Sequence, residues 1–358
     1  MLKLVLGIDA SKDDCKCNLS KLTSELEVKV ISTKVFLNTE NGLKELLKWI
    51  KKNQPKQVID LNAVIEASGV YYERFALGLQ QAGYRVSVVL PNKAKKYMQS
   101  LGIKTKNDHI DAKGLAQMGC EQKLKEWSPL SPFFHRLRTY TRLHEDIQQK
   151  KTDTANQLHA LKHSAVQIKD AIKILEKLIS AFDTELEKIK QLIETHVNGN
   201  EQVRERIEKI CNIKGVGLLT VATLAAETNG FELIANIPQL MSYSGYDVVE
   251  DQSGKRVGKT RISKKGNSHI RRILHMPAFQ MKTYQVGTMG ALFERTFDKH
   301  GIKMKSYVAI QRKLLILVYT LWKKNEKFDE NYHKKTSARV EEAVTSSRLS
   351  LEEAVSAN

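Results

Sequence analysis

The sequence is poor in the features that mark secreted, zinc-binding or membrane-spanning proteins. Its 358 residues contain four cysteines (Cys15, Cys17, Cys120 and Cys211), and none of them forms a CxxC pair or a His/Cys cluster with zinc spacing. No window reaches the roughly 18 apolar residues of a membrane helix. The first apolar run meets Asp9 before it has the length of a signal peptide. We therefore expect reduced thiols in a cytoplasmic, nucleoid-associated protein with no membrane partner.

Acidic residues are also few relative to basic ones. The chain carries 58 Lys and Arg against 40 Asp and Glu, which gives a formal net charge of +18. Such an excess favours a polyanionic partner, of which nucleic acid is the commonest, although basic proteins need not bind it. The chain is long enough for two or three domains.

Residues 1–130 alternate predicted strands with predicted helices. Strands are expected over 2–9, 15–22, 26–37, 62–66 and 84–90, and helices over 40–53, 71–83 and 108–119. This order predicts an α/β domain with a mixed sheet.

Proline and glycine are absent from 133 to 198, where two long stretches have helical periodicity. Such helices usually form a coiled coil or a helical hairpin, used for dimerisation or as a spacer. We assign 131–210 to coiled-coil helices, 211–332 to a mostly helical C-terminal domain, and 333–358 to a polar tail without an assigned role.

Four carboxylates stand out in the first domain. Asp9 and Glu66 each close an apolar predicted strand, where open α/β sheets place their sites. Asp108 and Asp111 lie three positions apart on one predicted helix and therefore share a face. Two magnesium ions about 4 Å apart need several hard oxygen ligands, so the four acids fit a two-metal phosphoryl-transfer site.

Each acid also has an ordinary alternative. An aspartate after a strand often caps a turn, Glu66 could cap a helix, and the Asp108/Asp111 pair could be a solvated helix face. Actin-like ATPases and sugar kinases also begin with a strand followed by Gly-Ile-Asp. They need later glycine-rich phosphate loops, and the chain has no convincing one and no GxxxxGK[ST] motif.

The segment "IKGVGLLTVATLAAE" resembles the second half of a helix–hairpin–helix. Gly215 and Gly217 would let the backbone approach a phosphate at a helix N-terminus, and a simple helix start is the alternative.

From Gln252 to Phe293 there are nine Lys or Arg and no acid, which favours a phosphate-binding surface over a solvated helix. Ser253 lies just before the first of these basic residues, in a Gln-Ser-Gly turn. It could attack a phosphate, or it could be an ordinary turn serine. The basic residues of this surface are Lys255, Arg256, Lys259, Arg261, Lys264, Lys265, Arg271 and Arg272.

From about residue 3 to 330, the segments run in the order found in a known family. They include "GIDASK", "IEASGVYYERFA", "KTKNDHIDAKGLA", "IKGVGLLTVATLAAE" and "YSGYDVVEDQSGKRVGKTRISKKGNSHIRRIL". In these segments the chain resembles the DEDD transposases (recombinases) of the IS110 family of insertion sequences. The resemblance implies a RuvC-like, RNase H-type domain, a coiled-coil insert and a C-terminal transposase domain. The extension beyond about 332 departs from the family.

The resemblance also implies the chemistry. It places the acidic tetrad, with Mg²⁺ or Mn²⁺, on Asp9, Glu66, Asp108 and Asp111. It places the serine that links covalently to DNA on Ser253, with Ser244 as a rival. The implied partners are donor and target DNA, a structured bridge RNA as guide, and further copies of the chain as dimers and a synaptic tetramer. The alternatives are a RuvC-like nuclease without a covalent step, a non-enzymatic scaffold and an actin-like ATPase.

Overall fold

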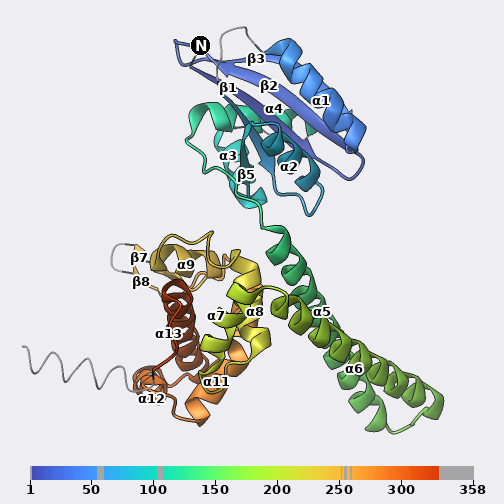
Figure 1. Cartoon of the computed structure of the whole chain (residues 1–358), viewed down its shortest axis with the longest axis vertical. Helices are drawn as coiled ribbons and strands as arrows, with labels where there is room; N and C mark the ends of the chain where they lie inside the picture. Colours follow the sequence, from blue (N-terminus) through green and yellow to red (C-terminus); the bar gives the residue numbers. More distant parts are fainter. Residues whose placement is uncertain are drawn as a thin grey trace, which may run out of the picture. The chain divides into compact units, whose positions relative to one another are not determined.

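A five-stranded mixed sheet forms the centre of the N-terminal unit, which comprises Met1–Pro129 (Figure 1). Its order is β3-β2-β1-β4-β5, with β1, β2 and β3 antiparallel and β1, β4 and β5 parallel. The sheet confirms the mixed arrangement predicted from the sequence. The strands are β1 (Lys3–Ala10), β2 (Asp14–Leu22), β3 (Val28–Leu37), β4 (Leu61–Glu66) and β5 (Arg85–Val89).

The structure is a computed structural model that describes residues 2–54, 60–102, 108–250, 252–253, 256–258 and 260–329. Within these ranges, the side chains of Asp108, Ser253 and Val257 are not described.

Helices cover both faces of the sheet because its central strands are apolar on both sides. Leu4, Leu6 and Ile8 pack with α1 (Glu40–Asn53) and α2 (Glu73–Gln81). Val5 and Val64 pack on the other face with α3 (Pro91–Ser100) and α4 (Asp108–Glu121).

Helix α3 was not predicted. The strand expected over 84–90 stops at Pro91, and Pro91 does follow β5 closely. It is also the first residue of α3, a position that proline favours because its missing N–H would be unsatisfied there anyway.

The second unit begins at Leu130 and opens with two long helices, α5 (Pro132–Lys162) and α6 (Lys169–Asn198). They run antiparallel, since Lys162 pairs with Glu176 near the connecting loop and His196 bonds to the carbonyl of Phe133 at the other end. The predicted long helices are confirmed as a hairpin, and coiled-coil packing stays a prediction.

The rest of the second unit is mostly helical, as predicted. Helix α8 lies at its centre, where every residue from Thr220 to Thr228 is buried. The base of the hairpin shares this core through Leu137 and Ile193. The helices are α7 (Glu201–Cys211), α8 (Leu218–Thr228), α9 (Ile237–Ser244), α10 (Ser268–Ile273), α11 (His275–Thr283), α12 (Met289–His300) and α13 (Lys303–Lys324).

Two short ladders lie between α9 and α10. Strand β6 (Val248–Val249) pairs with β9 (Arg261–Ile262), and β7 (Gln252–Ser253) pairs with β8 (Arg256–Val257). Across the described ranges, we find no helix with the combined length and apolar character needed to cross a bilayer.

Candidate active site and nucleic-acid interface

Asp9 and Glu66 occupy equivalent positions on neighbouring strands. In the parallel pair β1–β4, Ile8 lies opposite Ile65, so the residues that follow them stand together at the carboxyl edge of the sheet. Both are half-buried. The sequence prediction that each closes a strand is confirmed for Glu66, and Asp9 is the penultimate residue of its strand.

The two acids also lie on the same face of the sheet. Side chains alternate between faces along a strand. Val5 on β1 and Val64 on β4 pack against the α3 and α4 layer, so Asp9 and Glu66 lie on that side as well. The acids therefore face the layer that contains α4.

Helix α4 touches the backbone of β1 at Gly7. A Cβ built on Gly7 would lie 2.1 Å from the carbonyl oxygen of Ala112 and 2.4 Å from the amide nitrogen of Ala116. One turn further along, a Cβ on Gly119 would lie 2.6 Å from Val5. Helix α4 therefore runs in the direction opposite to β1. Gly7, the glycine of the "GIDASK" segment, has no side chain, and this lets the helix approach the strand.

This direction places the start of α4 at the edge that carries the strand-end acids. Asp108 is the first residue of α4, and Asp111 is half-buried one turn later, next to the residue that contacts Gly7. The start of α4, with Asp108 and Asp111, therefore lies at the same end as Asp9 and Glu66, on the face of the sheet toward which those two acids point. Their roles stay a prediction.

Residues that the sequence did not single out hold this edge together. The Ser68 hydroxyl donates to the carbonyl of Ala10 at 2.6 Å, which links the ends of β4 and β1. The buried Asn38 amide donates to the carbonyls of Ser11 at 2.8 Å and Tyr71 at 2.9 Å. A single asparagine thus connects the loops after three strands, and no local sequence signal reveals it.

The donors at this edge have the chemistry that a hard divalent cation requires, since carboxylate oxygens are preferred Mg²⁺ ligands. Among the side chains that the structure describes, no three His, Cys, Asp or Glu groups are close enough to hold a metal ion. The Asp108 side chain falls outside that set. The fit to a metal therefore rests on donor type and on placement at one edge.

The cysteines are not candidates for catalysis. All four are free thiols. Burial, with smaller contributions from the charges of Asp14 and Asp9, raises the pKa of Cys15 to about 12. Burial likewise raises the pKa of Cys120 and Cys211 to about 11, so these thiols stay protonated near neutral pH.

Ser253 and its rival Ser244 have different settings. Ser253 ends β7, directly opposite Arg256 of β8, and so is the last paired residue before a two-residue connection rather than the centre of a turn. Ser244 is fully buried at the end of α9, and its hydroxyl donates to the carbonyl of Leu240 at 2.6 Å. Burial removes Ser244 as a nucleophile for DNA.

The two ends of the segment between α9 and α10 are in backbone contact. Gly245 and Gly266 lie so close that a Cβ on Gly266 would be 2.4 Å from the Gly245 amide nitrogen. The Arg271 guanidinium donates to the carbonyls of Ser244 at 2.8 Å and of Gly266 and Asn267 at 3.2 Å. Arg271, which charge counting assigned to phosphate binding, thus has a role within the fold.

Asn267, the residue before α10, donates a hydrogen bond to a buried carboxylate. Glu227 of α8 is fully buried and accepts from Asn267 at 2.6 Å and from two nitrogens of Arg142 at 2.7 and 2.9 Å. Arg138 lies 3.3 Å from the same carboxylate. Burial alone raises the pKa of Glu227, but the bond from Arg142 and the charges of both arginines outweigh it and lower the pKa below 4.5.

The remaining predicted basic residues are exposed wherever the structure describes them. They are Arg256, Arg261, Lys264, Lys265 and Arg272. Arg272 differs from the others in that it also contacts α5, donating to Glu145 at 2.8 Å and contacting Gln149. Lys255 and Lys259 lie outside the described residues.

The turn between α7 and α8 carries the predicted phosphate-approach glycines. Gly215 has a φ of +89°, a left-handed conformation that favours glycine. Gly217 caps α8, and among the described atoms a Cβ there would meet nothing within 4 Å. The open backbone at Gly217 is compatible with the predicted approach of a phosphate, which stays a prediction.

Comparison with known proteins identifies the class of enzyme. Residues 6–161 match the DEDD domain of IS110 transposases, described as "Transposase", and residues 207–293 match "Transposase IS116/IS110/IS902 family". The first match contains the four acids and the second contains Ser253. The two matches together span more than half of the sequence, and the chain belongs to this family of DNA transposases.

Curated relatives span nearly the whole chain. The pilin gene-inverting proteins of Moraxella bovis and Moraxella lacunata are each 26% identical over 339 residues, covering 93% of this chain and all of each relative. Among solved structures, the Thermus thermophilus RuvC structure matches 35% of this chain and 99% of its own, with 13% identity and a TM-score of 0.28.

Proposed function

We propose that this transposase cleaves and rejoins DNA through a serine-linked intermediate, assisted by a divalent metal at the carboxyl edge of the sheet. The observation that carries the proposal is the placement of Asp9 and Glu66 on adjacent strand ends, facing the layer in which α4 begins. The sheet order, with an antiparallel neighbour (β2) on one side of β1 and a parallel neighbour (β4) on the other, supports a RuvC-like, RNase H-type assignment.

In this proposal the tetrad of Asp9, Glu66, Asp108 and Asp111 would hold Mg²⁺, or Mn²⁺ in its place. When bound, the metal supplies Lewis-acid polarisation of the phosphodiester oxygens. A hard cation also explains why a chain with a net charge of +18 gathers acids at one edge.

The Ser253 hydroxyl is the proposed nucleophile. Its Oγ forms a bond to phosphorus, the bond from phosphorus to the sugar oxygen breaks, and the released DNA hydroxyl takes the serine proton. The hydroxyl of a partner strand then attacks the same phosphorus, the Oγ–P bond breaks, and the serine regains a proton. The phosphodiester energy is retained, so the reaction needs no ATP.

The exposed Arg256, Arg261, Lys264 and Lys265 are proposed to bind nucleic-acid phosphates, with the backbone at Gly215 and Gly217. The large positive charge would serve to bind two polyanions, DNA and a structured guide RNA. The names of the Moraxella relatives support rearrangement of DNA as the reaction. Further copies of the chain, as a dimer and a synaptic tetramer, would bring the exchanged strands together.

A metal-dependent nuclease without a covalent step is the second candidate, because the acid edge alone suits hydrolysis. Ser253→Ala separates the two functions on the element's end DNA with its guide RNA and Mg²⁺. The recombinase loses strand exchange and the protein–DNA link, whereas a nuclease keeps cutting. Ser268→Ala, at an exposed serine of α10, is the matched control and should behave as wild type.

A further inference from the structure

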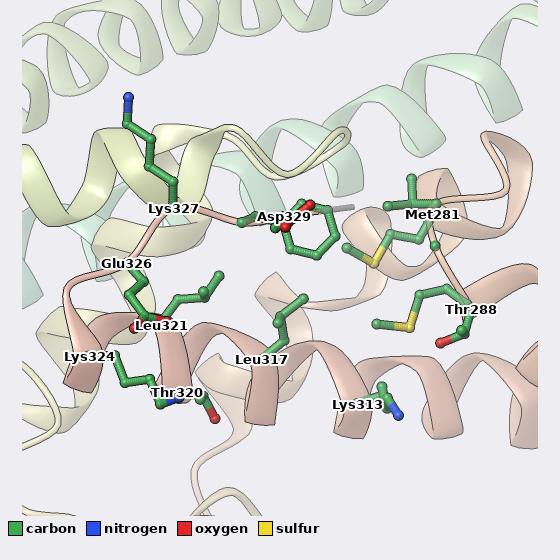
Figure 2. Close-up of a pocket in the computed structure, with 14 residues that line it drawn as sticks. Met281, Thr288, Lys313, Leu317, Thr320, Leu321, Lys324, Glu326, Lys327 and Asp329 are labelled. Carbon is green, nitrogen blue, oxygen red and sulfur yellow. The ribbon is translucent and has the colours of Figure 1, made fainter. Parts of the chain in front are cut away.

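A cavity of about 450 Å³ lies in the second unit, away from both sets of predicted site residues in the sequence (Figure 2). It is bounded by the end of α11, the loop before α12, one side of α13 and the segment that follows α13. Its size falls within the range of small-ligand sites. Neither the acids nor the segment around Ser253 contributes to its lining.

The interior of the cavity is apolar and includes one aromatic ring. Met281 and Met289 are buried and Leu317 is half-buried, and all three line it together with Phe328. Figure 2 shows Leu317 extending from α13 toward the segment that carries Asp329, with Met281 at one end. A flat aromatic ligand would find a ring and polarizable thioethers to pack against.

The rest of the lining has the opposite character. Lys313 and Lys324 line the cavity from α13, and Thr288 and Thr320 add hydroxyl groups. Helix α13 carries six Lys or Arg and no acid. The exposed Glu326 adds a carboxylate that can accept from an amino group. Lys327 and Asp329 also line the cavity, so its charged groups are three cations and two carboxylates. An apolar lining with an excess of cations matches a ligand that joins a flat ring to a phosphate.

The wall around Phe328 is held by specific bonds. Asn325 ends α13 in a left-handed conformation, with a φ of +56°, and turns the chain back. From α7, Arg206 donates to the carbonyl of Trp322 at 2.6 Å, and Lys209 donates to that of Asn325 at 3.0 Å. The turn that brings the 326–329 segment over α13 is therefore anchored.

We propose that this cavity binds one unstacked nucleotide of a single-stranded nucleic acid. The base stacks on Phe328 between Met281 and Leu317, and its flanking phosphates contact Lys313 and Lys324. Extruded bases are held in this way in other proteins, between apolar or aromatic side chains with basic groups on the backbone. The proposal concerns binding, so it does not depend on whether Ser253 is the nucleophile.

The first test measures binding of fluorescent 12-nucleotide single-stranded RNA and DNA to the full chain. Removing a stacking ring typically weakens binding roughly 5- to 100-fold, and Phe328→Ala should lower affinity in this range for at least one strand type. In an abasic scan, one base of the strand is removed at a time. Removing the base that occupies the cavity should weaken binding to wild type by the same factor, and it should not weaken binding to Phe328→Ala any further. Phe279→Ala, an exposed ring of α11 outside the cavity, is the control.

The strand type that responds identifies the source of the nucleotide, guide RNA or DNA. Lys313→Ala with Lys324→Ala should weaken binding more than Lys303→Ala with Lys305→Ala, which removes equal charge from the same helix outside the cavity. Equal losses would mean general charge attraction and would overturn the proposal.

A photocrosslinking measurement on the wild-type protein does not depend on whether the variants fold. Strands carrying one photoreactive base should crosslink to residues of the cavity, among them Phe328 and Met289. Crosslinks confined to other parts of the chain, or no abasic position that matters, would also overturn the proposal.

Discussion

Glu227 in the second unit and Asp9 in the first are both acids held by core elements, but their surroundings differ. Glu227 is fully buried and enclosed by arginines and an asparagine of the same chain. Asp9 is half-buried at a sheet edge, beside Glu66 on the next strand. The comparison separates an acid that joins parts of the fold from acids placed to meet a ligand.

The largest expected effect comes from an acid at the edge. Asp9→Asn should lower Mg²⁺-dependent strand cleavage about a thousandfold or more, because a metal ligand is lost while the shape is kept. Its melting temperature should change little. Asp13→Asn, at an exposed acid four residues along, is the control. Equal activity of the Asp9 variant and wild type in a labelled-DNA cleavage assay would assign Asp9 to structure alone.

Glu227→Ala tests the other side of the comparison. It leaves Arg138 and Arg142 without their shared carboxylate and should lower the free energy of unfolding by about 3 kcal/mol. This is the low end for a buried pair, since both arginines are about a third exposed. Urea unfolding measures the loss, and Glu232→Ala, at an exposed acid on the loop after α8, is the control. A loss no larger than that of Glu232→Ala would contradict the structural role.

The same carboxylate sets an acid limit on stability. Because folding lowers the pKa of Glu227, its stabilisation is complete above about pH 4.5 and is lost as pH falls through the lower folded pKa. Glu227→Gln should therefore have a smaller fall in melting temperature between pH 5 and pH 3 than wild type. Parallel profiles for the two proteins would show that Glu227 does not contribute to the acid dependence.

Gly7→Ala tests whether α4 must approach β1 for the acids to work. The added methyl group would meet the backbone of Ala112 and Ala116, so α4 has to shift. We expect a stability loss of about 1–3 kcal/mol and a higher Mg²⁺ requirement for cleavage. Gly83→Ala is also strained, because its φ is +85°, yet it meets no described atom within 4 Å. It should cost stability without changing the Mg²⁺ requirement.

The smallest effects distinguish the basic residues. Arg261→Ala should reduce the slope of log affinity against log salt by about 1, as expected for one phosphate contact. Arg272→Ala should leave that slope nearly unchanged, because its guanidinium is bound by Glu145 and Gln149. Binding isotherms at several salt concentrations measure both, and equal slopes for the two variants would contradict the division.

The strands, and the acids at their ends, were predictable because a buried strand is a continuous apolar run whose end is visible in sequence. Helix α3 was missed because Pro91 was interpreted as a stop and not also as a start. Asn38 and Glu227 were missed for a different reason. Their partners are distant in sequence, Arg142 lying 85 residues from Glu227, and no local pattern encodes such a pairing. Counting charge could not separate Arg271, which bonds to carbonyls, from residues that face solvent.

The most direct test of the account is to map the link between protein and DNA. Full-length protein, guide RNA and labelled element-end DNA are incubated with Mg²⁺, denatured and digested, and the nucleotide-bearing peptide is sequenced by mass spectrometry. The account predicts a phosphodiester on Ser253 that forms with Mg²⁺ and is absent in Asp9→Asn. Mg²⁺-dependent cleavage that persists in Ser253→Ala, with no modified serine, would contradict it.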